Sequence, residues 1–444
     1  MPMRHTLLAI ALTAALPLGA HAEDLLQVYR DARGYDAQYG AARFAVEAGR
    51  EKLPQGRALL LPTLNLTGSA TDTRTDFESD DPAANPSFNR DARAYGGTLN
   101  LSQPIYRKQN FIQYDQAGYQ VKQAEAAFSQ SSQDLIVRAS QAYFDVLAAQ
   151  DTLELVGAQK AAISEQLAQA KRNFEVGTAT ITDTHEAQAR YDLSVAQEIL
   201  AQNDLDVKKR TLQQITGKEY GALKPLRHDV KLTMPTPNNM QAWVDMAQKQ
   251  SYTVLVQDAI TEIARLEADR NQAGHYPTLD LVASYGYLNQ SGTLVTPIGS
   301  NVTNGQVGLQ LGVPIYQGGA ISSRAREAAF NYDKAKQDLE NARRSSALAA
   351  QQAFLASVNG VAQVQALEQA LVSSQSALES NKLGYEVGVR INIDVLNAQQ
   401  QLFQTRRDLA VARYNLITSR LKLRAAAGTL TEDDLQRVNA VLAP

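Results

Sequence analysis

The stretch that decides the fold is LPTLNL at residues 61–66, which returns as YPTLDL at residues 276–281. Two further strings return in the same order, QPIY (103–106) as VPIY (313–316) and FEVG (174–177) as YEVG (385–388). The copies are 215 residues apart for the first string, 210 for the second and 211 for the third. Because the order of these landmarks never changes, the sequence indicates two copies of one ancestral unit.

Within each copy, a helical stretch (residues 24–58 and 240–273) is followed by two short segments that alternate apolar and small polar residues. The apolar positions fall on every second residue, as in Leu64, Leu66, Leu99, Leu101, Leu279, Leu281, Leu309 and Leu311. Period two with one apolar face predicts β-strands. We expect four strands per chain, each of about 9–14 residues, a length that suits an outer-membrane crossing at a tilt.

After each strand pair the chain becomes helical for a long way, since no proline lies between Pro104 and Pro225 or between Pro314 and Pro444. Residues 107–176 and 317–386 predict helices of about 70 residues, each reaching about 100 Å. A turn and a helix of about 34 residues follow, ending near Gly217 or Gly428. Apolar residues spaced by seven predict a coiled-coil seam at Val395, Leu402, Leu409, Leu416 and Leu423, and a shorter one at Leu193, Leu200 and Val207.

The first residues have the pattern of a secretory signal peptide. Arg4 precedes an apolar run from Leu7 to Leu18, and small residues at Ala20 and Ala22 form a cleavage site. The predicted organisation is a signal peptide (1–22), a first repeat (23–217), an equatorial linker (218–239), a second repeat (240–428) and a C-terminal equatorial segment (429–444). The chain has no cysteine, which excludes disulfide scaffolds. Its net charge of -3 does not favour a nucleic-acid partner.

Four strands cannot close a barrel by themselves, and an open sheet in lipid would leave backbone groups without partners. Closure therefore requires several copies, and three copies would give twelve strands around an aqueous lumen. Tyrosines in or beside the strands could form an interfacial girdle: Tyr95, Tyr106, Tyr276, Tyr285, Tyr287 and Tyr316. The alternatives are a water-soluble strand sandwich, a soluble helical rod, or an exported coiled-coil scaffold or adhesin without a pore.

The order of strands, long helix, Val-Gly turn and helix, present twice, resembles the TolC family of outer membrane efflux and type I secretion channels. The supporting strings include LLPTL (60–64), FEVG (174–177) and LGVPIYQGG (311–319). The resemblance implies an α+β membrane protein that forms a homotrimer, with a twelve-stranded β-barrel in the outer membrane and a helical coiled-coil tunnel in the periplasm. It also implies docking onto a periplasmic adaptor and an inner-membrane ABC or proton-driven transporter.

The resemblance further implies site residues by motif position. The adaptor-docking tip would consist of Val176, Gly177, Thr178, Val387, Gly388 and Val389. A closed periplasmic gate would use Thr182, Asp183, Tyr385, Arg390, Asp394 and Asn397. At Asn397 the chain departs from the family, because an amide replaces a carboxylate, so these positions give a trimer three ring carboxylates instead of six. Asp183 has a second interpretation as a helix cap, with Glu186 three residues later.

An enzymatic interpretation finds little support in the sequence. The histidines that follow the signal peptide, His185, His228 and His275, are scattered without metal-ligand or triad spacing, and no GxxxxGK[ST] loop is present. We therefore expect no catalytic, cofactor or metal site, and a channel of this kind would take its energy from a partner.

Overall fold

The computed structural model describes residues 22–81, 83, 86–227, 230, 233–292 and 298–443. The signal peptide up to residue 21, and His228, lie outside this range. The chain forms two compact units, one from residues 1–40, 131–244 and 349–444 and the other from residues 41–130 and 245–348. Each unit draws on both sequence repeats, so the compact units and the repeats divide the chain differently.

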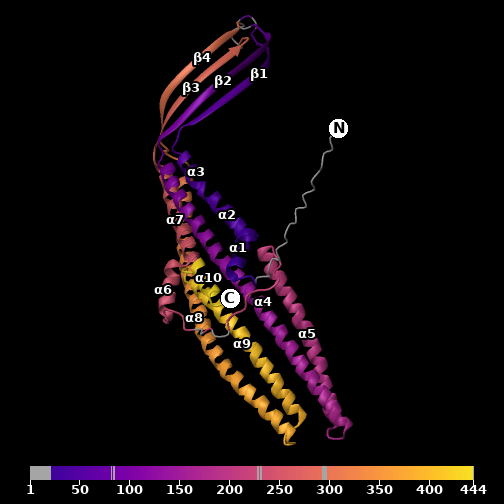
Figure 1. Ribbon diagram of the computed structural model, residues 1–444. Helices are drawn as coiled ribbons and strands as arrows, with labels where there is room; N and C mark the ends of the chain where they lie inside the picture. The colour runs from indigo at the N-terminus through magenta and orange to yellow at the C-terminus, as the bar shows by residue number, and fades with distance from the viewer. Residues whose placement is uncertain are drawn as a thin grey trace, which may run out of the picture. The chain divides into compact units, whose positions relative to one another are not determined.

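The second unit contains one antiparallel sheet of order β1-β2-β3-β4 (Figure 1). Its strands are β1 (Thr63–Phe77), β2 (Phe88–Tyr106), β3 (Thr278–Gln290) and β4 (Ser300–Gly312). Leu66 pairs with Leu99, Leu99 with Tyr285 and Tyr285 with Gly305, so the alternating apolar positions share one face, as predicted. This face is exposed, and in the described part of the chain no second sheet covers it, which contradicts the soluble sandwich.

Two strands are longer than expected, since β1 has 15 residues and β2 has 19. The pairing of β2 with β3 begins only at Ala94, so the rest of the first hairpin continues as a two-stranded ribbon. Polar cross-strand pairs stabilise this extension, including Arg93 with Asp72 at 3.3 Å. The apolar alternation ends before this ribbon, and for that reason the sequence pattern underestimated both strands.

Helices of the second unit adjoin one end of the sheet (Figure 1). They are α2 (Ala37–Arg50), α3 (Lys52–Ala58), α7 (Tyr252–Gln272), the short η1 (Ala273–His275), and the first parts of α4 (Lys108–Glu175) and α8 (Ala320–Glu386). Ile112, Leu266 and Ala273 form a buried cluster among them. Gly56 permits close approach of α3 to α4, because a Cβ at this position would lie 2.8 Å from the Cβ of Ala117.

The helical stretches predicted for residues 24–58 and 240–273 are confirmed, and both are interrupted. The first breaks at Asp36, between α1 (Leu25–Tyr35) and α2, and the second at Ser251, between α6 (Met240–Gln250) and α7. Asp36 caps the next helix by accepting a 2.7 Å hydrogen bond from the backbone N–H of Tyr39. The two breaks are 215 residues apart, which is the repeat spacing of the adjacent strands.

The first unit is helical. It contains α1, α5 (Ile181–Thr216), α9 (Asn392–Ala426), α10 (Glu432–Asn439) and the remaining parts of α4 and α8. The 68-residue α4 and 67-residue α8 match the predicted long helices. The predicted seam of α9 is buried, and its residues Leu409 and Leu416 pack against Val361 and Val364 of α8.

The shorter seam predicted on α5 is not buried within the single chain. Leu193, Leu200 and Val207 are 50%, 68% and 54% exposed. The buried residues of α5 begin with small side chains one position further along, such as Ser194 and Ala201, and continue with Leu205 and Leu212. Heptad spacing of large apolar residues therefore identifies an apolar stripe on a helix. Within the single chain, the stripe at Leu193, Leu200 and Val207 remains exposed to solvent.

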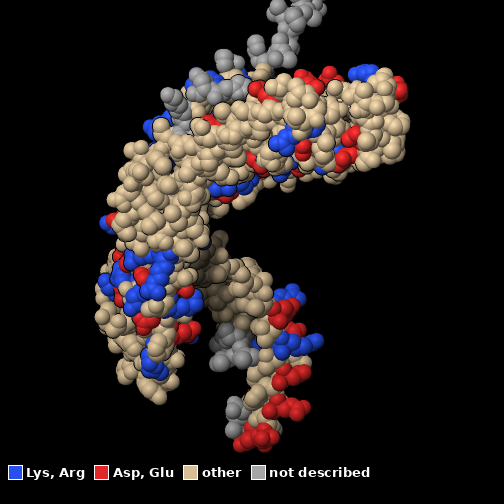
Figure 2. Space-filling view, turned by 90° about the horizontal axis from the view of Figure 1, so that it is seen from below, with Lys and Arg blue, Asp and Glu red and all other residues tan. Residues whose placement is uncertain are grey.

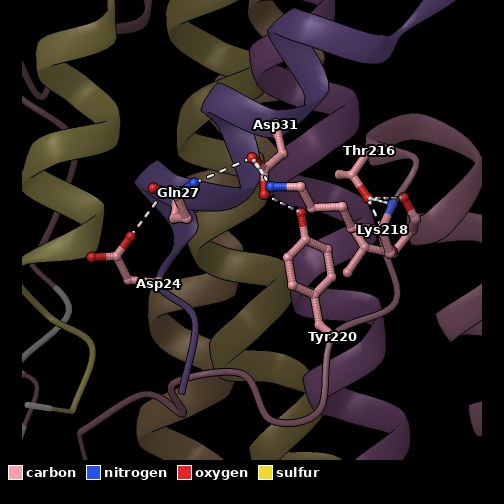
Figure 3. A network of polar contacts seen from close by, with 7 residues as sticks. Asp24, Gln27, Asp31, Thr216, Lys218 and Tyr220 are labelled. Carbon is pink, nitrogen blue, oxygen red and sulfur yellow. Dashed lines mark hydrogen bonds and ion pairs between the residues drawn. The ribbon is translucent and has the colours of Figure 1, made fainter. Parts of the chain in front are cut away.

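Polar contacts tie α1 to the segment that follows α5. Figure 3 shows Lys218 and Tyr220 reaching the largely buried carboxylate of Asp31, at 2.7 and 2.9 Å. Nearby, Arg138 of α4 forms a two-pronged ion pair with Asp36 at 2.9 and 3.0 Å. These hydrogen bonds from Arg138 lower the pKa of the Asp36 carboxyl below its ordinary value. The pair thus stabilises the helical unit through the charged form of Asp36.

Candidate functional site: the two helix reversals

The candidate site is formed by the two turns that join α4 to α5 and α8 to α9. Two residues beyond the end of each helix lies a glycine in the left-handed region, Gly177 with φ of 80° and Gly388 with φ of 79°. In each turn the glycine N–H donates to the carbonyl three residues earlier, and the next N–H donates to the carbonyl five residues earlier. This double closure is the Schellman motif, which requires a residue that tolerates positive φ.

The two turns differ in how the following helix begins. Thr180 caps α5 in a capping box with Asp183, whose carboxylate accepts 3.0 Å and 2.7 Å hydrogen bonds from the backbone N–H and the hydroxyl of Thr180. The equivalent residue 211 positions later is Ile391, which has no side-chain cap to offer α9. The interpretation of Asp183 as a residue preceding the helix, boxed with Glu186, is therefore wrong: Asp183 is the third helical residue of a box that Thr180 opens.

This divergence changes what the two equivalent carboxylates do. Asp183 is held by Thr180, whereas Asp394 lies 3.7 Å from the guanidinium of Arg390, one helical turn away. Within one chain the predicted partners Asp183 and Arg390 thus make separate local contacts. Because both Arg390 and Asp394 are substantially solvent-accessible, their pair contributes little to the stability of a single chain.

The other predicted gate residues are distributed over the same turns. Thr182 is exposed on the first turn of α5. The hydroxyl of Tyr385 accepts a 3.2 Å hydrogen bond from the amide of Asn173, which links the ends of α8 and α4. Asn397 is exposed on α9 and accepts a 2.9 Å hydrogen bond from Arg190 of α5.

Two contacts of this site were not predicted from the sequence. Arg190 bridges α5 to α9 by donating to Gln400 at 2.7 Å as well as to Asn397. Gln166 of α4 donates at 2.7 Å to the side-chain amide oxygen of Asn392, which is buried at the start of α9. No local motif marks Arg190, because its partners lie 210 and 207 residues away along the chain.

The predicted tip residues present apolar side chains to solvent. Val176 follows α4, and Val387 and Val389 flank Gly388; all three valines are exposed. On the face seen in Figure 2, Lys and Arg lie beside Asp and Glu in several areas, and broad areas without charged side chains separate these areas. Each of the two turns thus exposes at least one valine.

No group of three or more His, Cys, Asp or Glu side chains suited to a metal ion occurs in the residues that the structure describes. His185 is exposed near the start of α5, and His275 ends η1. Among the described helices, none is both long enough and apolar enough to cross a membrane.

Comparison with known proteins identifies relatives over nearly the whole chain. The outer membrane protein TolC of Vibrio cholerae is 36% identical over 95% of this chain and 94% of its own length. The proteases secretion protein PrtF of Dickeya chrysanthemi is 34% identical, with coverage of 97% and 94%. These matches confirm the resemblance to the TolC family.

Solved structures agree with the fold. The outer membrane protein VceC of Vibrio cholerae superposes with a TM-score of 0.77 at 19% identity, over 91% of this chain and 96% of that one. The MtrE outer membrane channel of Neisseria gonorrhoeae gives 0.71 at 16%, over 92% and 90%. The expected fold class, with four strands and long helices in each chain, is confirmed, and a trimeric barrel is consistent with these structures. The sequence pattern described as Outer membrane efflux protein matches residues 28–218 and 243–429, and the chain belongs to that family.

Proposed function

We propose that this chain is one protomer of an outer-membrane exit duct that serves an efflux pump or a type I secretion system. The observation that carries the proposal is the open sheet, whose apolar face is exposed and whose edge strands β1 and β4 have no partner strand in the described chain. In lipid, such a sheet must be completed by further copies. Relatives named for secretion and for efflux support both uses of the duct.

Three copies are the number that best fits the sheet. Twelve strands enclose a lumen wide enough for water, whereas eight strands leave an interior that side chains fill. The face opposite the apolar one carries small and polar residues, among them Thr67, Thr98, Ser284 and Asn304, as the lining of an aqueous channel should. The homotrimer would thus place lipid outside and water inside the same sheet.

The two helix reversals would form the periplasmic end of the duct. A periplasmic adaptor would dock onto these turns and connect the duct to an inner-membrane ABC or proton-driven transporter. The docking residues would be exposed Val176, Val387 and Val389, together with Gly177, Thr178 and Gly388. Catalysis plays no part in this proposal, because the transporter would supply the energy.

The gate would use polar contacts that form between neighbouring chains when the tip closes. Arg390 and Asp183 would take part, since each has donor or acceptor capacity beyond its local contact. Thr182, Tyr385 and Asn397 would complete these contacts, and Asp394 of each chain would provide three carboxylates at the constriction. Opening would require the adaptor and the transporter to separate the tip helices.

Conductance measurements test this function directly. The purified protein should migrate as a heat-modifiable trimer and conduct ions in planar bilayers, and Arg390→Ala and Asp183→Ala should raise its conductance. An exported scaffold or adhesin would instead be non-conducting and soluble without detergent, and this result would overturn the duct. Unchanged conductance in both variants would remove these two residues from the gate while leaving the duct intact.

A further inference from the structure

The internal duplication extends to the pairing register of the strands. In the first hairpin Thr63 pairs with Ser102, and in the second Thr278 pairs with Gly312. Moving β1 by the repeat spacing of 215 and β2 by 210 converts the first pair into the second. The two hairpins are therefore equivalent residue by residue, and the sequence spacings hold in the structure.

The seam between these hairpins, β2 with β3, lies within the chain and has a known register. Leu99 pairs with Tyr285, and Leu101 pairs with Ala283. The next seam in a closed barrel would join β4 of one copy to β1 of the next. If all hairpins of the barrel are equivalent, this intermolecular seam repeats the register of the internal one.

We propose that β4 pairs with β1 of a second copy in the register obtained by moving β2 forward by 210 residues and β3 back by 215. Leu309 then lies opposite Ala70, and Leu311 opposite Gly68, of the neighbouring chain. The inference rests on the proposed function, because it requires the barrel to close between copies, and it specifies which residues meet when it does.

The alternation of the two edge strands supports this register independently. The apolar face uses even-numbered residues of β1, such as Leu66, and odd-numbered residues of β4, such as Leu309. A slip by one residue would turn every leucine of one strand toward the lumen. The repeat-derived pairs place Leu309, Leu311 and Val313 opposite Ala70, Gly68 and Leu66, and the row of Val307 meets Asp72, where the polar ribbon of the first hairpin begins.

The C-terminal end of β4 supplies a second argument. The equivalent strand β2 continues to Tyr106, and its last residues pair with β3 through an irregularity between Pro104 and Tyr106. In contrast, β4 ends at Gly312, and the residues that follow it are strongly exposed. The exposed fraction is 93% for Ile315 and 85% for Tyr316. These residues lack a partner strand in the single chain, and the neighbouring β1 would extend β4 over them.

One polar contact changes character between the two seams. Within the chain, Arg107 donates to both carboxylate oxygens of buried Asp280, at 2.8 and 2.6 Å. The repeat equivalents are Gln317 and Asn65 of the neighbouring chain. The seam between copies would therefore hold an amide pair where the internal seam holds an ion pair.

Disulfide trapping tests the register, and the natural absence of cysteine makes every introduced thiol diagnostic. Leu309→Cys combined with Ala70→Cys should yield covalent dimers and trimers on oxidation. In antiparallel strands, residue pairs alternate between hydrogen-bonded and non-hydrogen-bonded pairs. A second double variant, Gln310→Cys with Ser69→Cys, therefore tests the adjacent pair, which is of the opposite type. Within one chain these positions lie on opposite edges of the four-stranded sheet and eight residues out of line along the strands, on the order of 30 Å apart, so an intrachain bond cannot form.

Register-shifted variants provide the controls. Leu309→Cys with Gly68→Cys, or with Asp72→Cys, places the thiols diagonally at about 7–8 Å and should cross-link at least tenfold more slowly. The matched internal pair, Leu99→Cys with Tyr285→Cys, should oxidise without forming oligomers. Faster trapping by a shifted pair in an intact trimer would overturn the register and leave the duct standing, whereas a monomeric protein would overturn both.

A charge-exchange cycle tests the seam without disulfides. Asn65→Asp combined with Gln317→Arg should recreate the internal ion pair between copies and raise the temperature at which the trimer dissociates in detergent above that of the unmodified protein. Each single variant should not. The control double variant combines Asn65→Asp with Gln310→Arg and should not show the increase in dissociation temperature. If the effects of Asn65→Asp and Gln317→Arg are purely additive, the proposed contact is contradicted.

Discussion

Replacing Thr180 by alanine should loosen the first turn of α5 while leaving the rest of the helical unit unchanged. The Thr180 hydroxyl accepts a 3.3 Å hydrogen bond from the backbone N–H of Asp183 and donates at 2.7 Å to its carboxylate. Alanine removes both contacts and keeps only the bond from the backbone N–H of residue 180 to Asp183. The loss is local, because Thr180 lies at an exposed helix start.

The expected magnitude follows from the capping interaction alone. Exchanging a threonine cap for alanine costs about 1 kcal/mol of helix stability. A change of this size corresponds to roughly a fivefold shift in the opening equilibrium of the first turn, since 1.36 kcal/mol is a factor of ten. Hydrogen exchange should therefore accelerate about fivefold at the amide of Asp183, which loses its acceptor, while amides in the middle of α5 keep their protection.

Ile391→Ala is the matched control, because Ile391 occupies the equivalent position of α9 and provides no side-chain cap. Hydrogen exchange followed by mass spectrometry on the detergent-solubilised protein should show acceleration at the start of α5 in Thr180→Ala and no comparable change at the start of α9 in Ile391→Ala. Equal acceleration in both variants, or none in Thr180→Ala, would refute the capping asymmetry between the two turns.

Three further predictions address other contacts. Asp36→Asn should weaken the helical unit at neutral pH, because Arg138 lowers the pKa of Asp36 and the charged pair stabilises the folded unit. Acid removes this contribution below pH 3.8, the ordinary pKa of the group, so the stability of the variant should depend less on pH in that range than the stability of the unmodified protein. Thermal unfolding followed by circular dichroism across pH would check both effects. Gly388→Ala should destabilise its turn by about 1–2 kcal/mol through its φ of 79°, whereas Gly157→Ala in α4 should not, and melting temperatures decide the matter. Arg190→Gln should weaken the link between α5 and α9 and raise single-channel conductance, and an unchanged conductance would show that this bridge does not restrain the gate.

Much of the fold could be predicted from the sequence, because its signals are local and repeated. Alternating residues such as Leu64 and Leu66 identified the strands and the face they share, and the register confirms that face. The proline-free segments predicted α4 and α8 to within three residues at each end. Glycines at positions 177 and 388 predicted the reversals, since positive φ favours glycine.

Other features depend on partners that no local pattern reveals. The stripe at Leu193, Leu200 and Val207 has the spacing of a buried seam, yet within the single chain α5 packs through other residues, including Ala201, Leu205 and Leu212. Spacing records that a helix has an apolar side and does not record which neighbour that side meets. Arg190 was missed for the same reason, because its contacts are set by the packing of α5 against α9.

The places where the two repeats differ are the places where equivalent residues meet different surroundings. Thr180 became Ile391, and the freed carboxylate of Asp394 faces Arg390 instead of closing a capping box. A duplication fixes the backbone of both copies, so hydrogen-bond patterns and registers persist, while side chains remain free to adapt to the neighbour that each copy meets. Divergence between equivalent positions is therefore a guide to function in this chain, because it separates contacts that only hold the fold from contacts that are specific to one turn or one seam.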